Sequence, residues 1–122
     1  MADGPMTLDQ QRRRVVLESI RRTCSHRDWA LLAAHVRSTH VHAVVASRSV
    51  PERVMGDLKA YASRALADAG FEPPPRRKWA RHGSTRWLWD PGNARAAIDY
   101  VVRGQGIDME VYESPELWRQ IP

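Results

Sequence analysis

Two adjacent extended segments in the first half of the chain constrain its fold most. Residues 29–38 and 40–47 are apolar over most of their length and contain neither proline nor glycine. Only Thr39 separates them, and so short a connection joins neighbouring antiparallel strands. The pattern therefore predicts a β-hairpin near the middle of the chain.

The second of these segments carries two histidines, His40 and His42, on either side of Val41. Because side chains alternate between the faces of a strand, both imidazoles point to the same side, together with Val44. Neutral imidazole nitrogens are good ligands for divalent metals, and a rigid strand would hold two of them ready. The spacing leaves two interpretations open: half of a metal site, or two histidines on the solvent face of a half-buried strand.

Helical spacing of apolar residues flanks the hairpin on both sides. Residues 7–24 form one such run, with Thr7 or Asp9 as its cap. Residues 49–69 form the second, which starts with Ser49 and Pro51 and stops at Gly70. Residues 94–103 form the third, with Asp90 or Asn93 as its cap and with Gly104 and Gly106 after its end. We therefore predict three helices. The outer face of the first carries arginines that either contact phosphate or face solvent, namely Arg12, Arg13, Arg14, Arg21 and Arg22.

Length and cysteine content bound the class of protein. A chain of 122 residues is expected to form one domain with its own core. The single cysteine, Cys24, excludes an internal disulfide and fits a reducing compartment, and its place in the first helical run favours a small buried side chain. No apolar run approaches the length of about 20 residues that a membrane span needs, and the N-terminus lacks the pattern of a signal peptide. We expect a cytoplasmic protein without a membrane segment.

The charge balance favours a nucleic-acid partner. Lys+Arg number 19 against 14 Asp+Glu, a net charge of +5, and the only lysines are Lys59 and Lys78. Arginine binds phosphate through two hydrogen bonds and stacks on bases, which lysine does not do. The alternative explanation is a compositional bias toward arginine and alanine.

Residues 71–90 combine a proline-rich segment with a segment rich in tryptophan and arginine. Three consecutive prolines exclude a helix or a central strand, so residues 71–78 are predicted to be an extended linker. Residues 79–90 permit two interpretations. Single-stranded nucleic acid could stack on them, or Trp87 and Trp89 could alternate within a strand and belong to the core.

Taken in order, these elements resemble the single-tyrosine HUH nucleases, named for histidine, hydrophobic residue, histidine; the family includes the insertion-sequence transposases and the REP-associated tyrosine transposases. The resemblance covers about residues 12–106. It rests on the order and spacing of four motifs: His40-Val41-His42, Lys59…Ser63-Arg64, Trp79…His82-Gly83-Ser84-Thr85-Arg86…Leu88-Trp89 and Ile98-Asp99-Tyr100-Val101…Gln105-Gly106. It implies an α+β, ferredoxin-like domain with an antiparallel sheet and helices on one face. The family's first strand, ahead of the first helix, is not visible in this sequence. Residues 107–122 are predicted to form a tail that packs loosely or reaches a partner subunit.

The resemblance also implies an activity. It is that of a metal-dependent single-stranded DNA endonuclease and strand transferase (transposase-like) that acts beside a DNA hairpin, usually as a homodimer. Tyr100 would attack the scissile phosphorus and form a 5′-phosphotyrosine. His40, His42 and Gln105 would hold Mg²⁺ or Mn²⁺, which polarises a non-bridging phosphate oxygen. The basic residues expected to contact DNA are Lys59, Arg64, Arg81 and Arg86.

Several assignments have alternatives. In much of the family the third ligand lies four residues after the tyrosine, and that position is Gly104 here. At about 100° per residue, Gln105 would reach the site only if the helix unwinds at Gly104. Tyr61 is the rival nucleophile, although it falls in the predicted buried stripe of its helix. His35 and His82 are possible neighbours of the site, and we interpret both as surface or packing residues.

Two other functions remain to be set against the nuclease. One is a catalytically inactive, domesticated nucleic-acid-binding module of the same fold, whose binding would depend on salt and not on metal. The other is an interaction protein without nucleic acid, for which the pattern of arginine and tryptophan would be accidental.

Overall fold

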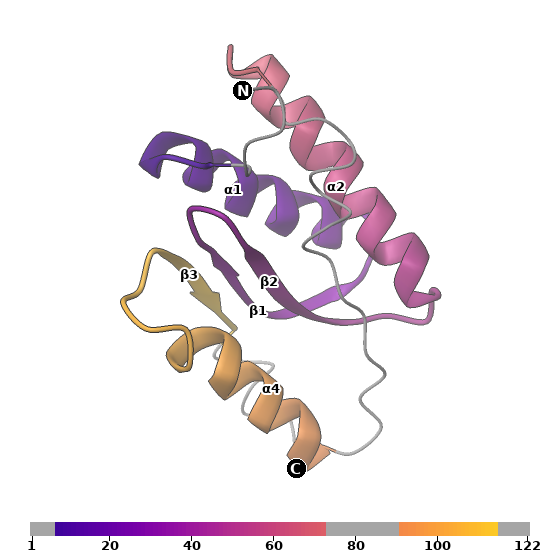
Figure 1. The fold of residues 1–122 in the computed structure, drawn as a ribbon. Helices are drawn as coiled ribbons and strands as arrows, with labels where there is room; N and C mark the ends of the chain where they lie inside the picture. The colour runs from indigo at the N-terminus through magenta and orange to yellow at the C-terminus, as the bar shows by residue number, and fades with distance from the viewer. Residues whose placement is uncertain (1–6, 73–90, 115–122) are drawn as a thin grey trace.

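The computed structural model describes residues 7–72 and 91–114. Its elements follow the order α1 (Gln10–His26), β1 (Ala30–Val36), β2 (Val41–Ala46), α2 (Pro51–Asp68), α4 (Pro91–Arg103) and β3 (Glu110–Glu113). The strands form one antiparallel sheet in the order β2-β1-β3. Figure 1 shows α1 and α2 on one face of this sheet and α4 on the other. The architecture is α+β, as predicted.

The predicted hairpin is confirmed as the pair β1 and β2, whose register matches Val36 with Val41 and His35 with His42. A β-bulge between Leu31 and Ala33 interrupts the alternation near the other end of the hairpin. Because of this irregularity, simple alternation along residues 29–38 assigns some side chains to the wrong face. Leu31 packs against the α1 side, whereas both Leu32 and Ala33 pack against the α4 side.

The first helix has the cap and the core face that its sequence predicts. Asp9 is the N-cap, and its side chain accepts a hydrogen bond from the backbone N–H of Arg12 at 2.9 Å. Val16, Ile20 and Cys24, at helical spacing, are buried against the sheet and α2. Cys24 is a free thiol with 1 % exposure, in agreement with the prediction of a small buried residue.

The second helix begins with proline at its first position, but its cap differs from the prediction. Val50 is the N-cap and makes no side-chain capping bond, whereas Ser49 donates its backbone N–H to Ser47 Oγ at 2.9 Å. At the other end Gly70 adopts a φ of 89°, the left-handed conformation that ends a helix and that favours glycine. Both predicted boundaries are therefore correct to within about two residues.

The last helix corrects the expectation that the helices lie on one face. Ile98, Val101 and Val102 of α4 pack with Leu32, Ala33 and Val44 on the face opposite α1 and α2. The physical reason is that β1 is buried from Leu31 to Val36 and thus apolar on both faces, so each face needs a cover. The helix starts at Pro91, before the predicted residue 94, so Asn93 lies within it and is not its cap.

The predicted tail also needs correction. Residues 110–113 are not loosely packed, because they form β3 and pair with β1, with Ala33 opposite Glu113 and Val36 opposite Glu110. Arg103 at the end of α4 donates to Glu113 Oε1 at 2.9 Å and ties the helix to this strand.

The expectations for residues 73–90 lie outside the described residues. They concern the proline-rich linker, the tryptophan-rich segment, His82, Arg81 and Arg86. Within the described ranges, no helix is long and apolar enough to cross a membrane.

Candidate functional site

Two histidines of the hairpin and a tyrosine of the last helix meet on the α4 face of the sheet. The ring centroids of His42 and Tyr100 are 6.4 Å apart, and their planes are nearly perpendicular at 86°. The rings of His40 and His42 stack at 6.2 Å with 15° between their planes. The fold thus brings together three side chains that the sequence singled out separately.

The sheet determines which way the histidines point. Val44 is buried against α4, and His42, two residues earlier on the same strand, faces α4 as well. His40 immediately precedes β2, and its carbonyl accepts a hydrogen bond from the Arg37 backbone N–H at 2.8 Å, which continues the ladder. The prediction that both imidazoles lie on one face is confirmed.

The surroundings of His42 favour its neutral form. Burial lowers the pKa of His42 below its usual 6.5, and electrostatic interactions with His40, His35 and Arg37 lower this pKa further. The His40 ring lies 2.8 Å from Thr39 Oγ1 through its Nδ1 atom. A hydrogen bond from Nδ1–H to this hydroxyl would fix the orientation and the tautomer of the His40 ring, as such bonds do for histidines that bind metals.

Tyr100 is accessible, and Gly104 shapes its position. The tyrosine is 58 % exposed on the last turn of α4. A β-carbon at position 104 would lie 2.8 Å from both Cδ1 and the carbonyl oxygen of Tyr100. Glycine at this position therefore lets the phenol ring lie along the end of the helix, where a side chain would displace it.

The same helix end decides where Gln105 can lie. The helix stops at Arg103, with the Gly104 N–H donating to the Tyr100 carbonyl at 2.8 Å, so Gln105 follows the last turn and is free of its helical direction. The role of Gln105 as a metal ligand stays a prediction.

The predicted third ligand, Gln105, has an unsatisfied polar atom. Gln105 Nε2 is buried without a hydrogen-bond partner. The two ends of an amide are interchangeable in such assignments, so a turned amide would present its oxygen, a cation ligand, at that place. Across residues 7–72 and 91–114, no three His, Cys, Asp or Glu side chains are grouped to hold a metal. Gln105 therefore stays the predicted third ligand beside His40 and His42.

His35, which the sequence marked as a possible neighbour of the site with a surface or packing role, lies in this region and is fully buried. Its Nδ1 atom is 3.0 Å from the Val101 carbonyl, and its Nε2 atom is 3.0 Å from the Met109 backbone nitrogen. A hairpin with Thr39 as its only connecting residue would put Val36 opposite His42, so the pairing of His35 with His42 comes from the structure. Arg37, two residues further, donates to the Ile107 carbonyl at 2.8 Å and was not singled out.

The predicted DNA-binding residues of α2 are not part of this cluster. Lys59 and Arg64 lie on a helix that covers the sheet face opposite α4 (Figure 1). Lys59 is half-buried, and this burial lowers its pKa. The Arg64 guanidinium lies 5.4 Å from the centroid of the Tyr61 ring. Their role in DNA binding stays a prediction, and they lie on the opposite side of the sheet from Tyr100.

Tyr61 is also distant from the histidines, on the other side of the sheet. Its hydroxyl accepts a hydrogen bond from Arg27 at 3.4 Å, and its half-buried ring lies among arginines. Of the two candidate nucleophiles, Tyr100 is the one beside His42.

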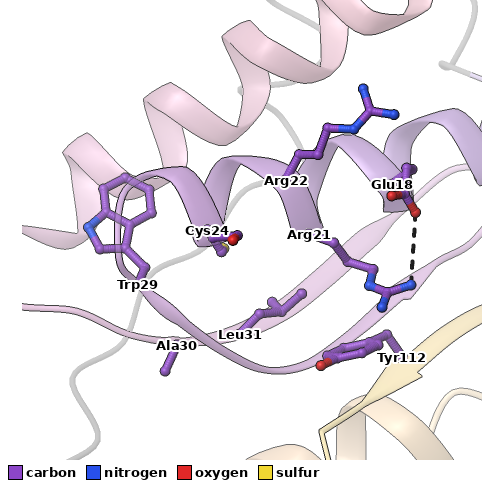
Figure 2. Close-up of a pocket in the computed structure, with 9 residues that line it drawn as sticks. Glu18, Arg21, Arg22, Cys24, Trp29, Ala30, Leu31 and Tyr112 are labelled. Atoms are coloured by element: carbon purple, nitrogen blue, oxygen red, sulfur yellow. Dashed lines mark ion pairs between the residues drawn. The ribbon is translucent and has the colours of Figure 1, made fainter.

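Most arginines of α1 are engaged within the chain. Arg12 pairs with Asp9, and Arg14 lies 3.7 Å from Glu110. Figure 2 shows Arg21 between Glu18 and Tyr112 in an open pocket of about 440 Å³; its guanidinium is 4.7 Å from the tyrosine ring centroid. These contacts favour a local role for this helix face over phosphate binding.

Comparison with protein-family models, with curated proteins and with solved structures finds no match to this chain.

Proposed function

We propose that this chain is a metal-dependent single-stranded DNA endonuclease and strand transferase of the HUH type, with Tyr100 as the nucleophile. The observation that carries the proposal is the contact of Tyr100 with His42, which itself stacks on His40. A nucleophile for phosphoryl transfer must lie beside the groups that bind the phosphate. An exposed tyrosine beside His42, with His40 stacked on the same imidazole, meets this condition.

The reaction uses the exposed phenol. Tyr100 Oη attacks the scissile phosphorus, the bond from phosphorus to the 3′-oxygen breaks, and the 5′-phosphate becomes attached to the tyrosine. The leaving strand takes a proton and departs as a 3′-hydroxyl. The reverse attack by a 3′-hydroxyl frees the tyrosine and reseals a strand, so the covalent intermediate conserves the phosphodiester bond.

The chain supplies the positions of the reacting groups. His42 is kept neutral by its burial, and Thr39 orients His40, so that both can act as ligands. A Mg²⁺ or Mn²⁺ ion held by His40, His42 and Gln105 would polarise a non-bridging oxygen and offset the negative charge of the transition state. The net charge of +5 favours association with the polyanionic strand. The proposed substrate is a single strand beside a hairpin, and the proposed assembly is a homodimer.

The second candidate is an inactive nucleic-acid-binding module of the same fold. It is favoured by the absence, within the part of the chain that the structure describes, of three grouped His, Cys, Asp or Glu side chains. Two imidazoles and one amide would be few protein ligands for a metal ion that catalyses phosphoryl transfer.

Covalent trapping separates the two. The purified protein is incubated with Mn²⁺ and labelled hairpin-flanked single strands of random flanking sequence, and adducts that resist denaturation are counted. We expect an adduct that chelation and Tyr100→Phe both abolish, and that the matched control Tyr61→Phe retains. An adduct that persists in Tyr100→Phe overturns the assignment. Salt-sensitive binding that ignores chelator, with no adduct on any strand, supports the inactive module.

A further inference from the structure

We infer that His35 is a positioning residue that holds Tyr100 and the segment containing Gln105 against the histidine-bearing strand. The catalytic consequence of this inference rests on the proposed function. The structural part depends only on the contacts of His35, whose buried imidazole joins β1 to α4 and to the connection before β3.

Both nitrogens of the His35 ring are used, each by a different segment. The Val101 carbonyl, 3.0 Å from Nδ1, belongs to the residue after Tyr100. The Met109 N–H, 3.0 Å from Nε2, lies beyond Gln105 in the connection to β3. His35 therefore binds both ends of the stretch from Val101 to Met109, which begins directly after the nucleophile and contains the predicted third ligand.

The two contacts determine the tautomer. A carbonyl oxygen only accepts, so Nδ1 carries the proton and donates it to Val101. The Met109 N–H only donates, so Nε2 presents its lone pair. The ring is thus the neutral tautomer with its proton on Nδ1, and its donor and acceptor are both satisfied although the side chain is fully buried.

The contact with Val101 matters because of where this residue lies in α4. The last four carbonyls of a helix lack partners within it, and the helix ends at Arg103. Tyr100 O is satisfied by Gly104 N–H, and Val101 O by His35. A strand side chain therefore completes the last turn of α4, which is the turn that carries the nucleophile.

The register of the hairpin also places His35 beside the strand that carries the predicted metal ligands. His35 is the cross-strand partner of His42 and lies on the same face of the sheet. One side chain is therefore adjacent to the ligand strand and bonded both to the tyrosine helix and to the following loop. An apolar residue of similar size would fill the space, but it would leave the Val101 carbonyl and the Met109 N–H buried without partners.

The test measures the distance between Tyr100 and the metal directly. The full chain is labelled with fluorotyrosine and titrated with Mn²⁺, whose paramagnetism broadens nearby resonances; Tyr61 and Tyr112 serve as internal references. The variants are His35→Leu, which loses both hydrogen bonds, and His35→Gln, which keeps an acceptor for the Met109 N–H. His26→Gln, at an exposed histidine of α1, is the matched control.

We expect Mn²⁺ affinity to be similar in all variants, because His40 and His42 are retained. In His35→Leu, the broadening of the Tyr100 signal falls, amide exchange at Met109 accelerates, and kcat for adduct formation drops about 100-fold with little change in KM. His35→Gln shows an intermediate loss of about tenfold in kcat, a partial rescue that a merely space-filling role would not produce. His26→Gln behaves as the wild type.

Each outcome decides a separate point. Mn²⁺ binding with unchanged Tyr100 broadening and unchanged kcat in His35→Leu overturns the positioning role. If that variant does not fold, unchanged values in His35→Gln overturn it equally. If Mn²⁺ does not broaden Tyr100 in the wild type, the proposed function fails. The role of His35 is then judged by amide exchange at Gly104, Gln105 and Met109, and unaltered exchange in both variants overturns it.

Discussion

Gly104 and Tyr100 are so close that a β-carbon on the glycine would lie 2.8 Å from the tyrosine Cδ1 atom. The glycine backbone has no positive φ, so its lack of a side chain is required by this contact and not by an unusual conformation. The position of the proposed nucleophile therefore depends on an empty space one helical turn along the chain.

The substitution Gly104→Ala is expected to displace the Tyr100 ring. The methyl group would also meet the Tyr100 carbonyl, so the change should destabilise the fold by about 1–3 kcal/mol and reduce adduct formation strongly. Denaturant unfolding and covalent trapping measure the two effects. Gly56→Ala is the matched control, because a β-carbon there meets nothing within 4 Å and alanine favours a helix interior by about 0.5–1 kcal/mol. Equal adduct yields in the two variants would contradict the role of Gly104.

Thr39→Val is expected to weaken metal binding without unfolding the protein. It removes the hydroxyl that lies 2.8 Å from His40 Nδ1, and such supporting bonds contribute about 10- to 100-fold to metal affinity. Mn²⁺ binding by calorimetry is the measurement. Thr39→Ser keeps the hydroxyl and should retain the affinity of the wild type. A loss in the serine variant as large as that in the valine variant would show that the methyl group matters and not the hydroxyl.

Ile98→Ala tests whether α4 is held by its own core. Ile98 is fully buried among Leu32, Ala33 and Val44, so its truncation should cost about 2–5 kcal/mol in the free energy of unfolding. Denaturant unfolding provides this value. Ala96→Gly, at an exposed position of the same helix, should cost only about 1 kcal/mol. A similar small cost for Ile98→Ala would mean that α4 is not packed on the sheet in solution.

The buried thiol of Cys24 predicts a loss of stability in alkali. Burial raises its pKa from 9.0 to about 11, so between these values the unfolded chain loses the thiol proton while the folded chain keeps it. The contribution is fully present below pH 9.0 and declines as the pH rises toward about 11. At about pH 10.5 the decline amounts to about 2 kcal/mol.

Other groups titrate in the same range, so the measurement is a difference. The unfolding free energy of the wild type should fall relative to that of Cys24→Ala between about pH 8 and about pH 10.5. Parallel curves for the two proteins would show that the thiol is accessible to solvent in the folded state.

Local patterns predicted the local structure well. Helical spacing and the cap at Asp9 located α1, and Pro51 and Gly70 bounded α2. The short connection located the hairpin, although residues 37–40, and not Thr39 alone, join its strands. These features depend on residues that are close together in the sequence, so the sequence pattern alone predicts them. Ser49 is not the cap because the helix begins one residue later, with Val50 at the cap position, and a difference of one residue at a helix end is not decided by composition.

The non-local features were the ones missed. Both the position of α4 on the opposite face and the pairing of β3 with β1 depend on how apolar surfaces are shared between distant segments. The bulge between Leu31 and Ala33 changes which side chains of β1 point to which face of the sheet, and alternation along the sequence does not reveal it. The burial of His35 agrees with the packing role expected for it, but its hydrogen bonds to Val101 and Met109 could not be predicted because these partners are far along the chain.

The sequence by itself predicted that His40 and His42 share one face, from the two-residue period of a strand, and the stacking of the two rings agrees with it. Through the resemblance, it also predicted Tyr100 as the nucleophile and Gln105 as the third metal ligand. Only the tertiary structure decided that Tyr100, and not Tyr61, lies beside His42, and that His35 joins the strand to the tyrosine helix. The physical reason is that the face of the sheet on which a helix packs is set by burial over the whole core. No single segment carries that information.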